Sequence, residues 1–287
     1  MSHYLTLALV LVASVVPLGR TAAQEKAAQR RIDALEFHLR AQEKPGLLVP
    51  MYIYPADIHT NADYNRLIEL KRQFSTVPFW VIVNPASGPG TQVDANYTKA
   101  IDRLRGAGCV CLGYVRTDYA KRSVTEVKGD LDQWLKLYPA IQGVFFDEMI
   151  YEDTDRGVQH QLALKEQAKS IGIWPIVANP GTDTPSRYFA ANVADVIVVH
   201  EGDAWAKEAR LKGDYFGGYS DFPPFTRGVL LHSLAKLDVT QLRMTSKYAK
   251  WIYVTEDPYK PGDPKADNPW DSLSKHLPEI CETLKSN

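Results

Sequence analysis

The sequence predicts an α/β protein made of a single (β/α)8 TIM-type barrel, preceded by a signal peptide and a short helix. From Gly46 onward, eight short runs of β-branched and aromatic residues follow one another along the chain. Amphipathic stretches of ten or more residues lie between them, and no repeat or low-complexity tract interrupts the pattern. Alternation of this kind is typical of a parallel barrel whose outer face is covered by helices.

Each predicted strand is a nearly continuous apolar run, as expected for a parallel strand that is buried on both faces. The runs are GLLVPMYIY (46–54), FWVIVN (79–84), CVCLGYV (109–115), GVFFDE (143–148), WPIVAN (174–179), DVIVVHE (195–201), GVLLHSL (228–234) and WIYVTE (251–256). Helical periodicity with Gly or Pro near the ends predicts helices at 62–74, 95–108, 124–139, 158–172, 238–250 and 271–285.

A doubly wound open sheet is the alternative architecture. It would need a glycine-rich phosphate-binding turn after the first strand, where this chain has YPADIH (54–59). The glycine-rich ASGPG (86–90) lacks the P-loop lysine and the GxGxxG spacing, so we interpret it as a turn. The barrel is therefore favoured.

The N-terminal region is predicted to direct export. An apolar run of roughly 14 residues begins at Leu5, and the small residues Thr21 and Ala23 stand where a signal peptidase would cut. We expect a signal peptide over 1–23, a helical spacer over 24–45, a barrel over 46–287, and a secreted or cell-surface location. An uncleaved anchor is the alternative, although Pro17 and Arg20 interrupt the run.

Charge and cysteine content exclude some partners. The chain has 33 basic and 34 acidic residues, so it lacks the overall positive charge of proteins that bind nucleic acid or anionic membranes. We expect a monomer with no nucleic-acid partner and no stable membrane association after signal cleavage. Three buried thiols are favoured for Cys109, Cys111 and Cys281, and one bridge from Cys281 to either of the others is the alternative.

Polar and aromatic residues stand at the ends of the predicted strands, where barrel enzymes place their catalytic groups. Tyrosine rings can stack on sugar faces, while amides and carboxylates bind hydroxyls, so this set suits a polyhydroxylated ligand. The candidate substrate-binding residues are Tyr52, Tyr54, Asn84, Tyr114, Tyr119, Asn179, His200, His232 and Glu256.

Two of the strand ends provide the carboxyl groups that glycosidic bond cleavage requires. One such group must protonate the leaving oxygen, and the other must attack or activate water. Asp147 lies at the end of the fourth predicted strand, next to its last residue, and Glu201 is the last residue of the sixth. Glu148 directly follows Asp147, and adjacent strand residues point to opposite faces, so only one of this pair is expected to face the mouth.

Metal-dependent hydrolysis is the rival chemistry. Its ligands would come from His59, His200, His232, Asp147 and Asp203, but the first strand reads YIY where an amidohydrolase barrel would have HxH. A serine nucleophile is disfavoured because no G-x-S-x-G turn is present. We therefore expect neither a metal nor a cofactor.

Four segments resemble the spherulin-4 family of secreted proteins: GLLVPMYIYP, VIVNPASGPG, NYTKAIDRLRGAGCVCLGYVRTDYAKR and GVFFDE, in this order. The likeness runs from about Gly46 to about Pro258. It implies a (β/α)8 barrel and endo-acting hydrolysis of α-1,4-linked, galactosamine-containing polysaccharide such as galactosaminogalactan. It also implies Asp147 as nucleophile or principal anion, Glu201 as general acid/base and Glu148 as a supporting acid.

Two functions remain open at this point, a secreted endo-glycosidase and a non-catalytic carbohydrate-binding coat or cell-surface protein on the same barrel. A positively charged polysaccharide is the expected partner, because acidic residues gather in the loops that follow the strands. These residues are Asp57, Asp118, Glu152, Asp153, Asp155, Asp183, Asp203, Asp221 and Asp257.

Overall fold

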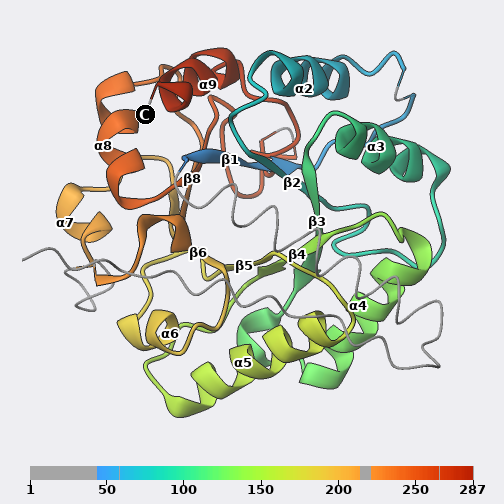
Figure 1. Ribbon diagram of the computed structural model, residues 1–287, viewed down its shortest axis with the longest axis vertical. Helices are drawn as coiled ribbons and strands as arrows, with labels where there is room; N and C mark the ends of the chain where they lie inside the picture. The colour runs from blue at the N-terminus through green and yellow to red at the C-terminus, as the bar shows by residue number, and fades with distance from the viewer. Residues whose placement is uncertain (1–43, 58, 214–220, 265, 287) are drawn as a thin grey trace, which may run out of the picture.

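The structure is a computed structural model that describes residues 44–57, 59–213, 221–264 and 266–286 (Figure 1). Eight parallel strands close into a barrel in which each strand pairs with the next along the chain and β8 pairs with β1. The predicted (β/α)8 barrel is confirmed. The strands are β1 (Gly46–Met51), β2 (Phe79–Val83), β3 (Val110–Arg116), β4 (Gly143–Asp147), β5 (Ile176–Asn179), β6 (Val196–Gly202), β7 (Arg227–Leu231) and β8 (Trp251–Val254).

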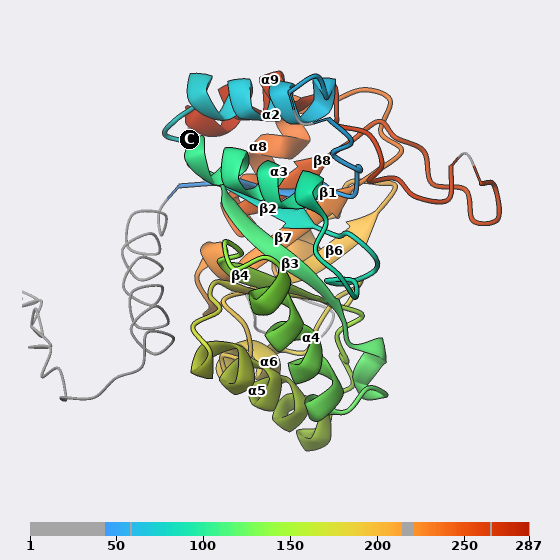
Figure 2. The same cartoon turned by 90° about the vertical axis from the view of Figure 1, so that its right-hand side faces the viewer.

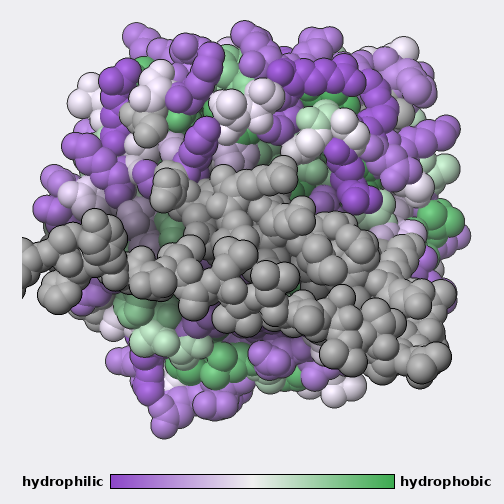
Figure 3. Space-filling model, in the orientation of Figure 1, coloured by the Kyte–Doolittle hydropathy of each residue, from purple (hydrophilic) through white to green (hydrophobic). Residues whose placement is uncertain are grey.

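Helices surround the barrel in both views (Figures 1 and 2). Hydrophilic side chains cover much of the visible outer rim of the molecule (Figure 3), as expected for helices that bury one face against the strands. The helices are α2 (Ala62–Gln73), α3 (Ala95–Gly106), α4 (Val124–Leu137), α5 (Asp155–Ser170), α6 (Ser186–Ala190), α7 (Glu208–Leu211), α8 (Val239–Tyr248) and α9 (Leu277–Lys285), with 3₁₀ turns η1 (Asp118–Ala120) and η3 (Pro224–Thr226).

Some element boundaries differ from the predicted ones. Strand β1 ends at Met51 because the next backbone amide, that of Tyr52, donates to the Trp270 carbonyl 3.2 Å away, outside the sheet ladder. Helix α9 begins at Leu277, and Pro278 occupies its first turn, where a missing amide proton costs little. Helices α6 and α7 were not predicted, because five and four residues are too few to reveal a helical period.

The contact between β3 and α4 links the core to the mouth of the barrel. A Cβ atom on Gly113 would lie 2.7 Å from the Trp134 ring, so only glycine lets this fully buried indole pack against the strand. The indole Nε1–H donates to the carbonyl oxygen of Tyr114 at 2.9 Å. This hydrogen bond fixes the backbone of Tyr114 on the strand. The position of the Tyr114 hydroxyl at the barrel mouth depends on that backbone.

The long segment between β8 and α9 projects beyond the strands on the side to which the β6 arrow points (Figure 2). This is the carboxyl end of the barrel strands. All three cysteines are buried free thiols. Residues 1–43, which hold the expected signal peptide and nearly all of the spacer, lie outside the described residues. No helix in the described ranges is long and apolar enough to cross a membrane.

Candidate active site

Asp147 is the last residue of β4 and lies at the mouth of the barrel. The Tyr114 hydroxyl donates to its Oδ2 at 2.8 Å, and the Asn179 side-chain amide donates to its Oδ1 at 2.9 Å. Burial raises the pKa of Asp147, while hydrogen bonds from Tyr114, the Glu148 backbone and Asn179 oppose that rise. The carboxylate is therefore held in one orientation by donors that stabilise its ionised form.

Glu201 lies near the end of β6 and shares a donor with Asp147. The same Asn179 Nδ2 that contacts Asp147 donates to Glu201 Oε2 at 2.7 Å. Burial first, and then the negative charge of Asp147, raise the pKa of Glu201 to about 7. One amide of β5 thus brings together carboxyl groups from the two flanking strands, and one of these acids can hold its proton at neutral pH.

The shared donor limits how far apart the two carboxyl groups can be. The two oxygens can be separated by no more than the sum of the two hydrogen-bond lengths. This limit applies to one oxygen of each carboxyl group, and it is compatible with the roughly 5–5.5 Å between the carboxyl groups of retaining glycosidases. The spacing is therefore compatible with a pair of carboxyl groups that act as nucleophile and acid.

Glu148 follows directly but is turned away from this pair. Its backbone adopts a left-handed conformation with φ of 54°, which is uncommon for a residue other than glycine. Its carboxylate accepts a hydrogen bond from Arg116 Nε at 2.7 Å, and a second nitrogen of Arg116 lies 3.1 Å from Asp118 Oδ1. The contact between Glu148 and Arg116 therefore links the end of β4 to the end of β3.

The turn after β3 is fixed to the strand that carries Asp147. The Thr117 hydroxyl lies within hydrogen-bond distance of the carbonyl oxygens of Asp147 and Glu148, at 2.9 and 2.8 Å. The next three residues, 118–120, all have positive φ, which costs free energy outside glycine. This turn presents Tyr119, 43% exposed, edge-on to Tyr151 with ring centroids 6.2 Å apart.

Tyr52 lies against the acidic pair from the β1 side. Its ring meets the ring of Tyr114 edge-on, with centroids 5.7 Å apart. Its pKa is raised by burial and then by the nearby charges of Asp147, Tyr114 and Glu201. Aromatic rings from the β1 and β3 ends therefore lie beside the two carboxyl groups from the β4 and β6 ends.

Other predicted binding residues contact the loops that follow the strands. Asn84 Oδ1 accepts from the Gly88 amide at 2.9 Å, which closes the glycine-rich turn over 86–90. A ring nitrogen of His200 lies 2.8 Å from the Ala204 carbonyl, and the His232 ring contacts Trp270 edge-on at 5.8 Å. The Glu256 carboxylate accepts from the Lys275 amide at 3.1 Å.

The loop acids are less available than the sequence suggests. Asp118 pairs with Arg116 and Lys121, and Arg187 pairs with both Asp153 and Asp155. These ion pairs neutralise part of the acidic excess that the sequence predicts at this end of the barrel. Among the described residues, no three His, Cys, Asp or Glu side chains are grouped as a metal site would require.

Comparison with known proteins places the chain in a family. The profile described as Spherulation-specific family 4, or Spherulin4, matches residues 46–284. The chain belongs to this family. Spherulin-4 from Physarum polycephalum is 32% identical to it over 170 residues, which are 59% of this chain. The match spans 47% of that protein, so this chain covers about half the length of the curated relative.

A solved structure is similar to the same Spherulin4 barrel. Sph3 from Aspergillus clavatus, in complex with GalNAc, superposes with a TM-score of 0.68 and 26% sequence identity. The likeness covers 84% of this chain and 98% of that one. In that structure, Sph3 holds GalNAc.

The Spherulin4 barrel also uses residues that sequence reasoning missed. Trp270 accepts from the Tyr52 amide and packs against His232, although it is distant from both in sequence. Tyr151 pairs with Tyr119. Asn179 was identified only as a binding residue, and its contact with both acids depends on β5 lying between β4 and β6. An aromatic residue in a long loop gives no signal of its own in the sequence.

Proposed function

We propose that this protein is a secreted, endo-acting glycoside hydrolase that cleaves α-1,4-linked polysaccharide containing galactosamine and N-acetylgalactosamine. The observation that carries the proposal is the Asp147–Asn179–Glu201 arrangement, in which one amide donor holds two carboxyl groups at a separation suited to retention. The GalNAc bound to the similar protein Sph3 supports the class of sugar.

The proposed reaction has two displacements. In the first, Asp147 attacks the anomeric carbon, the bond from that carbon to the glycosidic oxygen breaks, and Glu201 gives its proton to that oxygen. In the second, ionised Glu201 takes a proton from water, and the water oxygen displaces Asp147 from the same carbon. The α configuration is retained, and both acids return to their starting states.

The hydrogen bonds favour this division of roles. Asp147 accepts from two side chains, which stabilise its ionised form, whereas Asn179 is the one donor to Glu201 among the described residues. A pKa of about 7 for Glu201 leaves it largely protonated below neutral pH. Tyr114 orients Asp147, and Glu148 holds the strand end through Arg116.

The test is incubation of the mature protein with partially deacetylated α-1,4-galactosaminan, followed by mass analysis of the released oligosaccharides. An endo-acting enzyme releases a range of oligomers, and the Glu201→Gln variant releases none. A carbohydrate-binding coat protein on the same barrel is the alternative function. It would bind the polysaccharide with equal affinity before and after Glu201→Gln, with no turnover in either form.

A further inference from the structure

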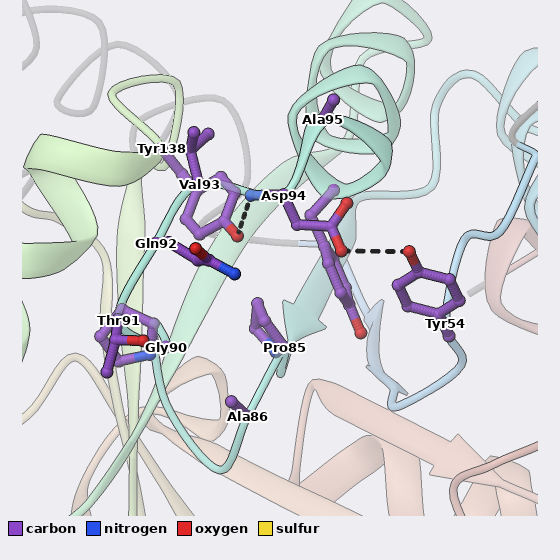
Figure 4. A pocket seen from close by; sticks show the side chains of 12 residues that line it. Tyr54, Pro85, Ala86, Gly90, Thr91, Gln92, Val93, Asp94, Ala95 and Tyr138 are labelled. Atoms are coloured by element: carbon purple, nitrogen blue, oxygen red, sulfur yellow. Dashed lines mark hydrogen bonds between the residues drawn. The ribbon is translucent and has the colours of Figure 1, made fainter.

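A second pocket lies beside the loop that joins β2 to α3, on the mouth side of the barrel (Figure 4). Its volume is about 460 Å³. Tyr54 follows β1 and forms one wall, while the loop from Pro85 to Asp94 forms the other. The buried rings of Tyr97 and Tyr138 lie beneath them. The site described above does not use this pocket.

Asp94 is held rigidly in this pocket. Its backbone amide donates to the Tyr138 hydroxyl oxygen at 3.1 Å (Figure 4). Its Oδ1 accepts from the Asn96 backbone amide at 2.8 Å. Its Oδ2 accepts from the Tyr54 hydroxyl at 3.1 Å, and that hydroxyl in turn accepts from the Asn96 side chain at 2.9 Å. The carboxylate is therefore oriented before any ligand arrives.

The charge on this carboxylate lacks a basic partner within the described ranges. No Lys, Arg or His of those ranges forms an ion pair with Asp94, although Asp118, Asp153 and Asp155 in other mouth loops are all paired. A carboxylate in a half-buried pocket with neutral donors favours a cation as its remaining partner. The nearby tyrosine faces add to the attraction for an ammonium group.

The pocket is connected to the catalytic pair through the segment that follows β1. Tyr54 is two residues from Tyr52, whose ring contacts Tyr114, and Tyr114 donates to Asp147. Strand β2 is two positions from β4 in the barrel, so their ends are separated by two strand spacings of about 4.8 Å each. A polysaccharide with one sugar unit at Asp147 can therefore reach the pocket with a later unit.

We propose that this pocket is a distal subsite that binds a sugar unit with a free amino group, with Asp94 as the partner of the ammonium and Tyr54 as the stacking surface. The inference rests on the proposed function, because a long amino-sugar polymer must lie across the mouth. Tyr54 is 50% exposed, and its ring meets that of Tyr97 edge-on at 5.6 Å, which supports the exposed face from behind.

The test is calorimetric binding of α-1,4-linked galactosamine oligosaccharides of increasing length, either fully N-acetylated or fully deacetylated. Asp94→Asn is compared with the parent protein, both carrying Glu201→Gln to prevent cleavage. Asparagine caps a helix as well as aspartate does. Its oxygen can accept from the Asn96 backbone amide while its NH2 group donates to the Tyr54 hydroxyl, so the charge is removed and both contacts keep a partner. Glu166→Gln on the exposed outer face of α5 is the control that removes one charge elsewhere.

Asp94→Asn should weaken binding of the longer deacetylated oligomers about threefold to tenfold, as expected for a charge-assisted contact at a half-exposed site. Binding of N-acetylated oligomers and of the shortest oligomers should change by less than about twofold, within the range of weak exposed contacts. The difference should fade as salt rises to about 0.5 M.

Identical affinities of Asp94→Asn and Glu166→Gln for the long deacetylated oligomers would overturn the subsite, even if the wild-type protein cleaves polymer normally. Absence of cleavage by the wild type, together with a loss of binding in Asp94→Asn, would overturn the proposed hydrolase and leave the subsite standing. Equal loss of binding for acetylated and deacetylated oligomers would overturn the role of the ammonium group.

Discussion

Asn179 and Glu201 lie 2.7 Å apart through a hydrogen bond whose donor also contacts Asp147 at 2.9 Å. The amide is nearly buried, and its own oxygen accepts from the Gly181 backbone, so the group cannot rotate freely. A single donor shared by two acids keeps their spacing fixed while their protonation states change.

Replacement of Asn179 by Ala should lower kcat by about 10- to 100-fold, the amount expected for loss of hydrogen bonds to charged groups. The pKa values of Asp147 and Glu201 should both rise, because the amide lowers each of them. The measurement is a pH–rate profile of kcat. Asn65→Ala on α2 is the control, since the Asn65 side chain bonds to His59 and Arg103, away from the acidic pair. An unchanged profile would contradict the shared role.

The activity of the wild-type protein should fall as pH rises through about 7, because Glu201 then loses the proton that it must donate. Activity should also fall in acid, as Asp147 becomes protonated. Initial rates on soluble polymer over a range of pH measure both limbs. A plateau that extends far above pH 7 would show that Glu201 is not the acid.

Glu201→Gln should stabilise the protein at pH 8 more than at pH 5. The pKa of Glu201 is about 7 when folded and about 4.5 when unfolded, so the wild type loses stability as pH rises between these values. The variant does not undergo this decrease in the free energy of unfolding, which is up to about 3 kcal/mol. Each kcal/mol corresponds to about 2–4 °C in Tm. Thermal unfolding at both pH values tests this, with Glu166→Gln as control; equal shifts at both would refute it.

Asp147→Asn should reduce kcat by orders of magnitude, while Glu148→Gln should cost much less, because Glu148 acts through Arg116. Arg116→Ala should resemble Glu148→Gln, and the double variant should add little to either. Proton NMR of the first product from an α-linked substrate should show the α anomer. A β product, or near-normal turnover by Asp147→Asn, would sink the mechanism.

Gly113→Ala should destabilise the barrel by about 1–3 kcal/mol, because the added methyl group overlaps the buried ring of Trp134. Gly129→Ala in α4 is the matched control, since a Cβ there meets nothing within 4 Å. Alanine at this helical position should stabilise the protein by about 0.5–1 kcal/mol. Denaturant unfolding of the two variants should therefore give shifts of opposite sign.

The sequence by itself determined the barrel, because eight apolar strands and the helical stretches between them admit few other arrangements. It also located Asp147 and Glu201 at strand ends, since a charged residue that terminates a buried run is visible in the sequence. The short helices α6 and α7 could not be predicted, because their few residues are too short a stretch to show helical periodicity.

Only the tertiary structure decided how these residues act together. Asn179 contacts both acids because β5 pairs with β4 on one side and β6 on the other. Glu148 turns toward Arg116 because the strand ends at Asp147 and the backbone changes hand there. Asp94 is oriented by a hydrogen bond from Tyr54, which lies 40 residues earlier in the sequence. Such contacts join residues that are far apart in the sequence. They form only when the barrel closes, so the order of residues along the chain does not reveal them.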